Sequence, residues 1–211
     1  MIHIRPHKMF DLAPEDTLGR MIHLKIPRRT ENWLIETVLL IAAMKAVNAR
    51  RIFEFGTFRG ATTLNLAMNA PPGAEIFTFD LDPTLKVEQD ARHAEITRQH
   101  FEAPKMEFEG IFHSIRQIQG DSHSFDAHPH APVDFVFVDG GHELRTIRAD
   151  TQNAIFMKPK AIAWHDYGNA DYPDVQQYLD GLSEHETLFH IEESRLCFWF
   201  AAASIRDRLR A

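Results

Sequence analysis

The sequence predicts an α/β fold of the doubly wound kind, in which helices cover one parallel sheet. The first observation is the stretch Phe53–Thr63, where an apolar run ends at Gly56 and a second glycine, Gly60, opens a helical pattern. Strand, glycine turn and helix in this order are typical of the first unit of such a sheet. The second observation is that five apolar runs each end in an acid or a glycine turn. We expect these residues to gather at one edge, where parallel strands end and ligands bind.

The strands are expected where short apolar runs are bounded by turn residues. Two of them, the last in the sequence, are separated by the tight turn 192–195 and are expected to pair antiparallel. The expected strands are residues 51–55, 75–80, 115–119, 133–138, 160–164, 187–191 and 196–202.

The helices are expected where a capping residue precedes apolar residues at helical spacing. Thr30 can cap the first helix, and Pro83 and Pro173 suit the first turn of two others. The expected helices are residues 31–48, 60–68, 83–100, 143–156 and 173–184. Residues 1–30 are expected to form an N-terminal lead-in with one helical turn, 101–114 show no clear pattern, and 31–211 form a single domain.

Composition narrows the class of protein. A chain of 211 residues is long enough for one domain with a sizeable core. The formal net charge of −7 disfavours a nucleic-acid partner, which needs a basic surface. The single cysteine, Cys197, excludes an internal disulfide and reads as a small buried hydrophobe. The N-terminus lacks a signal-peptide pattern, and the longest apolar stretch is far short of the ~20 residues of a membrane span, so we expect a cytoplasmic protein.

The glycine turn does not match the known phosphate-binding loops. A dinucleotide fingerprint needs a glycine where this chain has Phe58, and a Walker loop needs lysine where Ala61 follows Gly60. The turn is instead preceded by Glu54. A carboxylate at this place suits a ligand that carries positive charge and suits a phosphate poorly.

Polar residues follow each of the later strands in the same way. Asp80 ends the second strand, where an acid is placed to accept hydrogen bonds from ribose hydroxyls. The third strand is followed by Gly120-Asp121-Ser122, the fourth by Asp139-Gly-Gly-His142, and the fifth by His165-Asp166-Tyr167.

With these motifs in order, the sequence resembles the class I S-adenosylmethionine-dependent methyltransferases. More narrowly, it is similar to the small-molecule O-methyltransferases that include macrocin-type and catechol-type enzymes. The resemblance covers roughly residues 31–200. It implies a Rossmann-like, mostly parallel seven-stranded sheet with a C-terminal antiparallel hairpin, and S-adenosyl-L-methionine as the cofactor.

The resemblance also implies roles for individual residues at the edge of the sheet. The expected cofactor-binding residues are Glu54, Gly56, Thr57 and Gly60 at the methionine half, Asp80 at the ribose, Asp121 and Ser122 at the adenine, and Asp139 near the sulfonium and the acceptor. Asp80 and Asp121 also suit a purely local role as turn-capping residues.

Asp139, His142, His165 and Asp166 are the candidates for the chemistry itself. In metal-dependent relatives, acids that match Asp139 and Asp166 hold a divalent metal. Here His165 and Tyr167 stand where those relatives have a further acid or amide, and histidine suits zinc, manganese or iron better than magnesium. The alternative is a metal-free site in which His142 or His165 is the general base. A third reading has both histidines as hydrogen-bonded residues of the cleft.

We therefore expect an enzyme that methylates a hydroxyl of a small molecule, such as a sugar or natural product. Two rivals stay open: an NAD-dependent oxidoreductase on a similar sheet, and a non-catalytic cofactor-binding or scaffold protein. The expected partner is a small-molecule acceptor, with neither nucleic acid nor membrane, and the sequence leaves open whether the chain forms a homo-oligomer.

Overall fold

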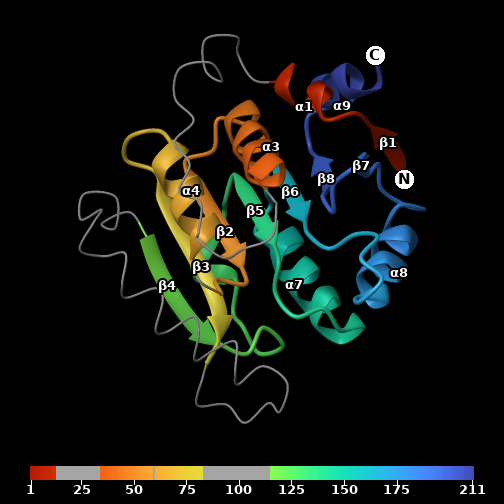
Figure 1. Cartoon of the computed structure of the whole chain (residues 1–211). Helices are drawn as coiled ribbons and strands as arrows, with labels where there is room; N and C mark the ends of the chain where they lie inside the picture. The colour runs from red at the N-terminus through yellow and green to blue at the C-terminus, as the bar shows by residue number, and fades with distance from the viewer. Residues whose placement is uncertain (13–33, 59, 83–114) are drawn as a thin grey trace.

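The computed structural model describes residues 1–12, 34–58, 60–82 and 115–211, and within them one sheet runs through the molecule (Figure 1). Its eight strands lie in the order β1-β7-β8-β6-β5-β2-β3-β4. They are β1 (Ile2–Ile4), β2 (Arg51–Phe55), β3 (Glu75–Leu81), β4 (Ile115–Gly120), β5 (Phe135–Val138), β6 (Ala161–Trp164), β7 (Phe189–Ile191) and β8 (Cys197–Phe200).

The sheet is parallel except for β8, which pairs antiparallel with both β6 and β7. The predicted mostly parallel sheet with a C-terminal antiparallel hairpin is therefore confirmed. The predicted number of seven strands is one too low, because β1 pairs parallel with β7 at the edge of the sheet. Three residues within the expected lead-in carry no strand pattern of their own, and their pairing depends on an edge formed almost 190 residues later.

The helices cover both faces of the sheet. Those that the structure describes are α1 (His7–Phe10), α3 (Leu34–Ala46), α4 (Ala61–Asn69), α7 (Leu144–Phe156), α8 (Pro173–Leu182) and α9 (Ala203–Arg210), with a 3₁₀ turn, η2, at His128–His130. The sequence analysis did not predict α9. The predicted helix 83–100 and the first residues of the helix predicted at 31–48 lie outside the described residues.

Side chains of successive strand residues alternate between the two faces and build two hydrophobic cores. One core joins Ile52, Phe135 and Phe137 to α1, α3, α4 and α9. The other joins Phe53 and Phe55 to α7 and α8. The helices that the structure describes do not cover the carboxyl ends of β2, β5 and β6. The candidate site lies there, next to the turn between β2 and α4.

A membrane crossing needs a long apolar helix, and none of the helices within the described residues is one.

Candidate functional site

A cavity of about 150 Å³ opens at the carboxyl ends of β2, β5 and β6. Its walls come from the first turns of α3 and α4, from the β2–α4 turn, and from the ends of β5 and β6. Four residues predicted to take part in the site line this cavity: Gly56, Thr57, Asp139 and His165. The expected gathering of motifs at one edge of the sheet is therefore seen in the structure.

Gly56 brings the β2–α4 turn into contact with the end of β5. Its φ is +92°, and a Cβ at this position would lie 1.9 Å from the carbonyl oxygen of Asp139. The Gly56 N–H donates to Phe79 O at 2.8 Å, while the Asp139 N–H donates to Phe55 O at 2.8 Å. Glycine is needed here because any side chain would push the turn away from Asp139.

The turn continues into α4 through Gly60. This glycine has a φ of +69° and precedes the first residue of the helix. Its N–H donates to Thr57 O at 2.7 Å and so closes the turn. Both glycines of the motif thus have left-handed backbone conformations, which glycine adopts at little cost.

Asp80 supports the same turn from the end of β3. Its Oδ2 accepts the backbone N–H groups of Thr57 and Phe58, at 3.0 and 2.8 Å, and its Oδ1 accepts that of Leu81 at 2.7 Å. Asp80 thus caps the turn after β2 as well as bonding its own neighbour Leu81, so its role reaches beyond the purely local one. Binding of ribose by Asp80 stays a prediction.

Glu54 lies beneath the turn rather than on the cavity wall. It is 1% exposed, and its Oε2 accepts the hydroxyls of Thr63 on α4 and Thr78 on β3. Its Oε1 has no hydrogen-bond partner within the described part of the chain. Burial, with a smaller effect from the charges of Asp139 and Asp80, raises the pKa of Glu54 to about 8 against the opposing effect of these two hydroxyls. Direct contact of Glu54 with a cofactor stays a prediction.

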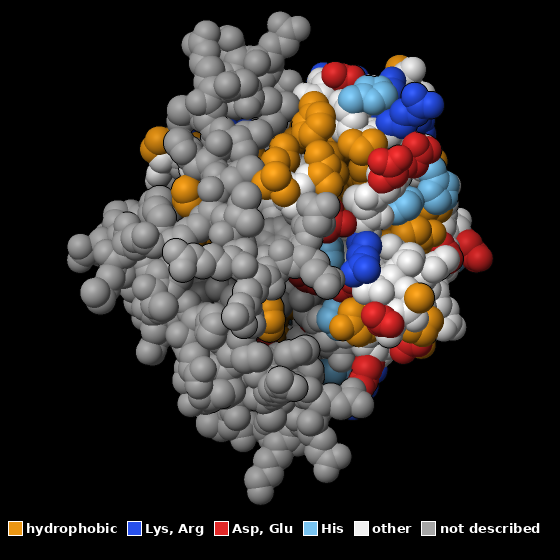
Figure 2. Space-filling model, in the orientation of Figure 1, with side chains coloured by type: hydrophobic (Ala, Val, Ile, Leu, Met, Phe, Trp, Pro, Cys, Tyr) orange, Lys and Arg blue, Asp and Glu red, His pale blue; other side chains and the backbone are white. Residues whose placement is uncertain are grey.

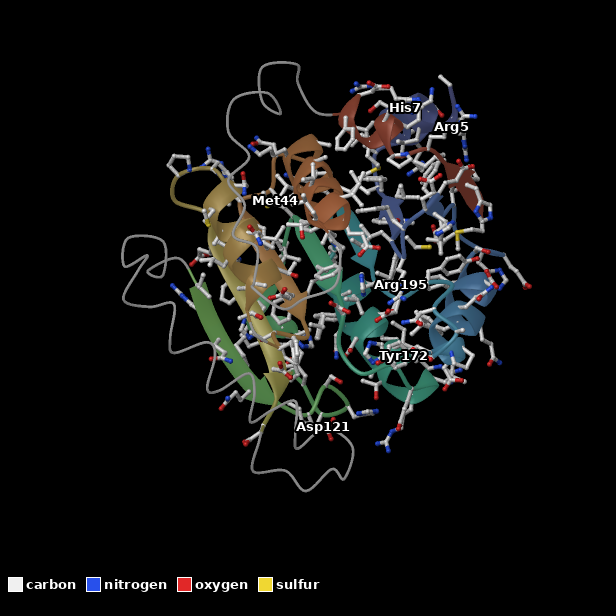
Figure 3. All side chains as sticks on the ribbon, viewed as in Figure 1. Arg5, His7, Met44, Asp121, Tyr172 and Arg195 are labelled. Atoms are coloured by element: carbon white, nitrogen blue, oxygen red, sulfur yellow. The ribbon has the colours of Figure 1, made fainter. Side chains whose placement is uncertain are left out.

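Asp121 and Ser122 follow β4, outside the residues that line the cavity (Figure 3). Asp121 Oδ1 lies 2.9 Å from the backbone nitrogen of His123, whose N–H it accepts, and 2.8 Å from the Nδ1 of the same residue. Asn153 on α7 donates to Ser122 O at 3.0 Å. The local turn-capping role of Asp121 is thus present, and the adenine contact stays a prediction.

Asp139, His142 and Asp166 converge beside the cavity, which Asp139 helps to line. Figure 2 shows acidic, basic and histidine side chains close together near the middle of one face of the molecule. One ligand atom from each lies within 4.8 Å of the other two. His142 Nε2 lies 2.8 Å from Asp166 Oδ2, and the His142 ring stacks on Tyr172, with centroids 3.7 Å apart and an interplanar angle of 12°. The imidazole is thus held on two sides.

Asp166 is the buried centre of this cluster. It is 5% exposed, has a φ of +62°, and accepts the side-chain amide of Asn169 at 2.7 Å. Burial acts to raise the pKa of Asp166, but hydrogen bonds from His142 and His165 outweigh it, and the pKa lies well below its ordinary value. Asp166 is therefore an ionised carboxylate near neutral pH.

His165 is enclosed by three carboxylates. Its Nε2 donates to Glu36 Oε2 at 3.1 Å, and its Nδ1 lies 3.3 Å from Asp139 Oδ1 and 3.2 Å from Asp166 Oδ2. Burial acts to lower the pKa of His165, but the charge of Asp139 and the hydrogen bonds to all three acids raise it well above its ordinary value. A protonated imidazole has no lone pair for a proton, so His142 is the better placed general base.

Glu36 and Arg195 are among the site residues that could not be identified from the sequence. Glu36 on α3 is 8% exposed, and its Oε1 accepts the backbone N–H of Arg195 at 2.6 Å. The Arg195 guanidinium lies 3.6 Å from Asp166 Oδ1 (Figure 3). In the sequence, Glu36 is marked only as an acid within a mainly apolar helical run. No sequence feature marks Arg195, which lies in the hairpin turn, as a site residue.

Comparisons with known proteins agree with this fold. None of the curated proteins compared matches the chain. Among solved structures, a cofactor-bound protein from MTB, Rv0187, is 20% identical with a TM-score of 0.58, over 92% of this chain and 88% of the other. The O-methyltransferase TomG from Streptomyces achromogenes, in complex with SAM, is 18% identical with a TM-score of 0.56, over 92% and 90%. An O-methyltransferase from Bacillus cereus, in complex with SAH, is 14% identical with a TM-score of 0.55, over 92% and 90%.

At these identities the solved structures establish the fold. The family follows from the sequence itself, because a methyltransferase domain model matches residues 53–167, from β2 through the cluster at the end of β6. This match spans more than half of the 211 residues and contains the glycine turn and all three members of the Asp139–His142–Asp166 cluster. The chain belongs to the methyltransferase domain family.

Proposed function

We propose that this chain transfers a methyl group from S-adenosylmethionine to a hydroxyl group of a small molecule. The observation that carries the proposal is the position of the Asp139–His142–Asp166 cluster, beside a cavity whose other wall is the glycine turn. Two of the similar structures are O-methyltransferases, one with SAM and one with SAH. S-adenosylmethionine supplies an electrophilic methyl group on a positively charged sulfur.

The residues around the cavity suit such a cofactor. Asp139 brings an acidic group to the cavity wall, where it favours a cationic ligand. The backbone of Gly56 and Thr57 lies at the same wall without a side chain at Gly56 to obstruct a ligand. Methyl transfer needs the attacking oxygen aligned with the methyl group, so most of the work of such a site is positioning.

The acceptor hydroxyl must also lose its proton. The ionised Asp166 accepts the Nε2 hydrogen of His142, which leaves Nδ1 of His142 as the nitrogen that can take a proton. Stacking on Tyr172 fixes the plane of the ring. We propose that His142 is the general base. His165 lies beside it, fixed in place and positively charged.

A divalent metal is the alternative way to lower the pKa of that hydroxyl. The donor set of Asp139, His142 and Asp166 fits a small cation, because one atom from each lies within 4.8 Å of the others. Two carboxylates with one imidazole suit manganese, iron or zinc better than magnesium. Turnover that survives EDTA favours the metal-free base, whereas loss of turnover that manganese restores better than magnesium favours the metal.

The test is release of S-adenosylhomocysteine in the presence of small hydroxylated acceptors, namely sugars, catechols and other phenols, with amine and thiol acceptors tested beside them. The wild type should produce it with at least one of them, together with the methylated product by mass spectrometry. Asp134→Asn, far from the cluster on the opposite end of β5, is the control for general effects of removing a carboxylate. Turnover confined to amine or thiol acceptors would overturn the hydroxyl assignment, and no product from any acceptor would support a non-catalytic role.

A further inference from the structure

Arg195 is fixed in the hairpin turn through its backbone. Its N–H donates to Glu36 Oε1 at 2.6 Å, and its carbonyl oxygen accepts the N–H of Tyr167 at 3.0 Å. The carbonyl oxygen of the preceding residue, Ser194, accepts a hydrogen bond from His190 Nε2 at 2.9 Å. The turn is therefore tied to α3, to the end of β6 and to β7, and it presents the Arg195 side chain at a set place.

The guanidinium of Arg195 keeps its hydrogen-bonding capacity. Its nearest charged partner is Asp166 Oδ1 at 3.6 Å, which is too long for a hydrogen bond, and the side chain is 54% exposed beside the site (Figure 3). Within the part of the chain that the structure describes, none of its N–H groups meets an acceptor. A cation with unused donors therefore stands at the edge of the Asp139–His142–Asp166 cluster.

Asp166 does not depend on Arg195 for its hydrogen bonds. Its Oδ1 accepts the amide of Asn169 at 2.7 Å, while its Oδ2 lies 2.8 Å from His142 Nε2 and 3.2 Å from His165 Nδ1. A guanidinium that served mainly to pair with this carboxylate would be expected to make the bidentate contact that such pairs favour. A half-exposed ion pair without that geometry contributes little to stability, so recognition of a ligand accounts better for the position of Arg195.

Arg195 and His142 flank the same carboxylate, that of Asp166. If the acceptor hydroxyl lies at His142, an acceptor the size of one ring can also reach the guanidinium. The other cation of the site, His165, is enclosed by three carboxylates and is already paired. A planar guanidinium with free donors matches a carboxylate, which offers two acceptor oxygens in one plane.

We propose that Arg195 binds a carboxylate of the methyl acceptor, so that the substrate is a small hydroxy acid. The inference rests on the proposed function, which places the acceptor hydroxyl at His142. Arg195 is a specificity residue in this account. It binds the acid group of the acceptor and takes no part in the transfer of the proton or of the methyl group.

The experiment uses acceptors in pairs that differ in charge, each hydroxy acid beside its own methyl ester. Glucuronate represents the sugars, protocatechuate the catechols and coumarate the other phenols. Release of S-adenosylhomocysteine is measured near neutral pH, where the acids are ionised. For the wild type, kcat/KM should be at least about tenfold higher for the acid than for its ester, the scale of a hydrogen bond to a charged group. The difference should lie mainly in KM, because the carboxylate is bound equally in the ground state and the transition state.

Three variants locate the preference. Arg195→Ala should reduce it to about twofold or less, by raising KM for the acid. Arg195→Lys should keep part of it, because lysine retains the charge but not the planar pair of donors. Arg210→Ala is the matched control, since it removes an arginine from the exposed end of α9, and it should keep the whole preference.

The outcomes separate this inference from the proposed function. Equal kcat/KM for acid and ester in the wild type leaves methyl transfer to a hydroxyl standing and contradicts the inference alone. An equal loss for acid and ester in Arg195→Ala would also overturn it, because Arg195 would then act on Asp166 and not on the acceptor. Should Arg195→Ala fail to fold, the comparison in the wild type decides by itself. No turnover of any acceptor contradicts the proposed function, and the inference with it.

Discussion

Replacing Glu54 with glutamine should remove a large pH dependence from the free energy of unfolding. Glu54 is fully buried beneath the glycine turn, and its pKa is raised to about 8, first by burial and then by Asp139 and Asp80. In the unfolded chain the same carboxyl has an ordinary pKa of 4.5. Between these two values the folded protein keeps a proton that the unfolded chain has lost.

The sign and size follow from proton linkage. A folded-state pKa above the unfolded one gives stability that is complete below pH 4.5 and is lost as the pH rises towards 8. The slope is about 1.4 kcal/mol per pH unit, or about 5 kcal/mol over the whole window. Between pH 5 and pH 8 the expected loss is about 3–4 kcal/mol. Glutamine does not titrate, and its carbonyl oxygen can replace Oε2 as the acceptor for Thr63 and Thr78.

The assay is urea denaturation of both proteins at pH 5, 6, 7 and 8. Relative to the wild type, Glu54→Gln should become progressively more stable as the pH rises, by about 3–4 kcal/mol in total. Asp134→Asn is the control. Burial acts to raise the pKa of Asp134, but Lys160 and the backbone N–H groups of Arg50 and Arg51 lower it. The pH dependence that Asp134 gives to the free energy of unfolding is therefore confined to pH values below 5. A difference in stability between wild type and Glu54→Gln that stays constant from pH 5 to pH 8 would show that Glu54 does not titrate in this range.

Four further variants address the cofactor, the glycine turn and the chemistry. Asp80→Ala should weaken S-adenosylhomocysteine binding by about 1–3 kcal/mol through lost ribose hydrogen bonds, and calorimetry that finds unchanged affinity would remove Asp80 from the site. Gly56→Ala should lower the free energy of unfolding by at least about 2 kcal/mol, because the new Cβ meets Asp139 at a positive φ; a smaller loss in urea denaturation would show that the turn relaxes easily. Asp139→Asn and His142→Ala should each reduce methyl transfer by at least about 100-fold with folding retained, and wild-type turnover in both would move the chemistry elsewhere.

The gathering of the motifs at one edge could be predicted because it depends on strand direction alone. Asp139 and His142 follow β5, His165 and Asp166 follow β6, and these neighbouring parallel strands end at the same edge. Once each apolar run is assigned to a strand of one sheet, the convergence of these four residues follows without knowledge of side-chain positions. The roles of these residues are a finer question, which the sequence leaves to experiment.

The contacts of Glu36 and Glu54 could not be predicted in the same way. Glu36 meets His165 across 129 residues of sequence, through the packing of α3 on the sheet. Glu54 faces α4 because Phe53 and Phe55 face α7, and its partner Thr78 is set by the register of β2 with β3. Register and helix packing arise from tertiary structure, so a local pattern reports neither of them.

The short elements β1 and α9 could not be predicted from the sequence for a related reason. β1 has three residues and is stabilised by pairing with β7, with the Ile2 N–H donating to Leu188 O at 2.9 Å. α9 is mainly exposed and buries only Leu209. Elements this short have little pattern of their own, and their existence depends on the surface that receives them.

Cofactor choice is tested by a calorimetric titration of the wild-type protein with S-adenosylmethionine and, separately, with NAD. We expect saturable binding of S-adenosylmethionine, weakened in Asp80→Ala, and no measurable binding of NAD. Binding of NAD in preference to S-adenosylmethionine would rule out the proposed methyl transfer.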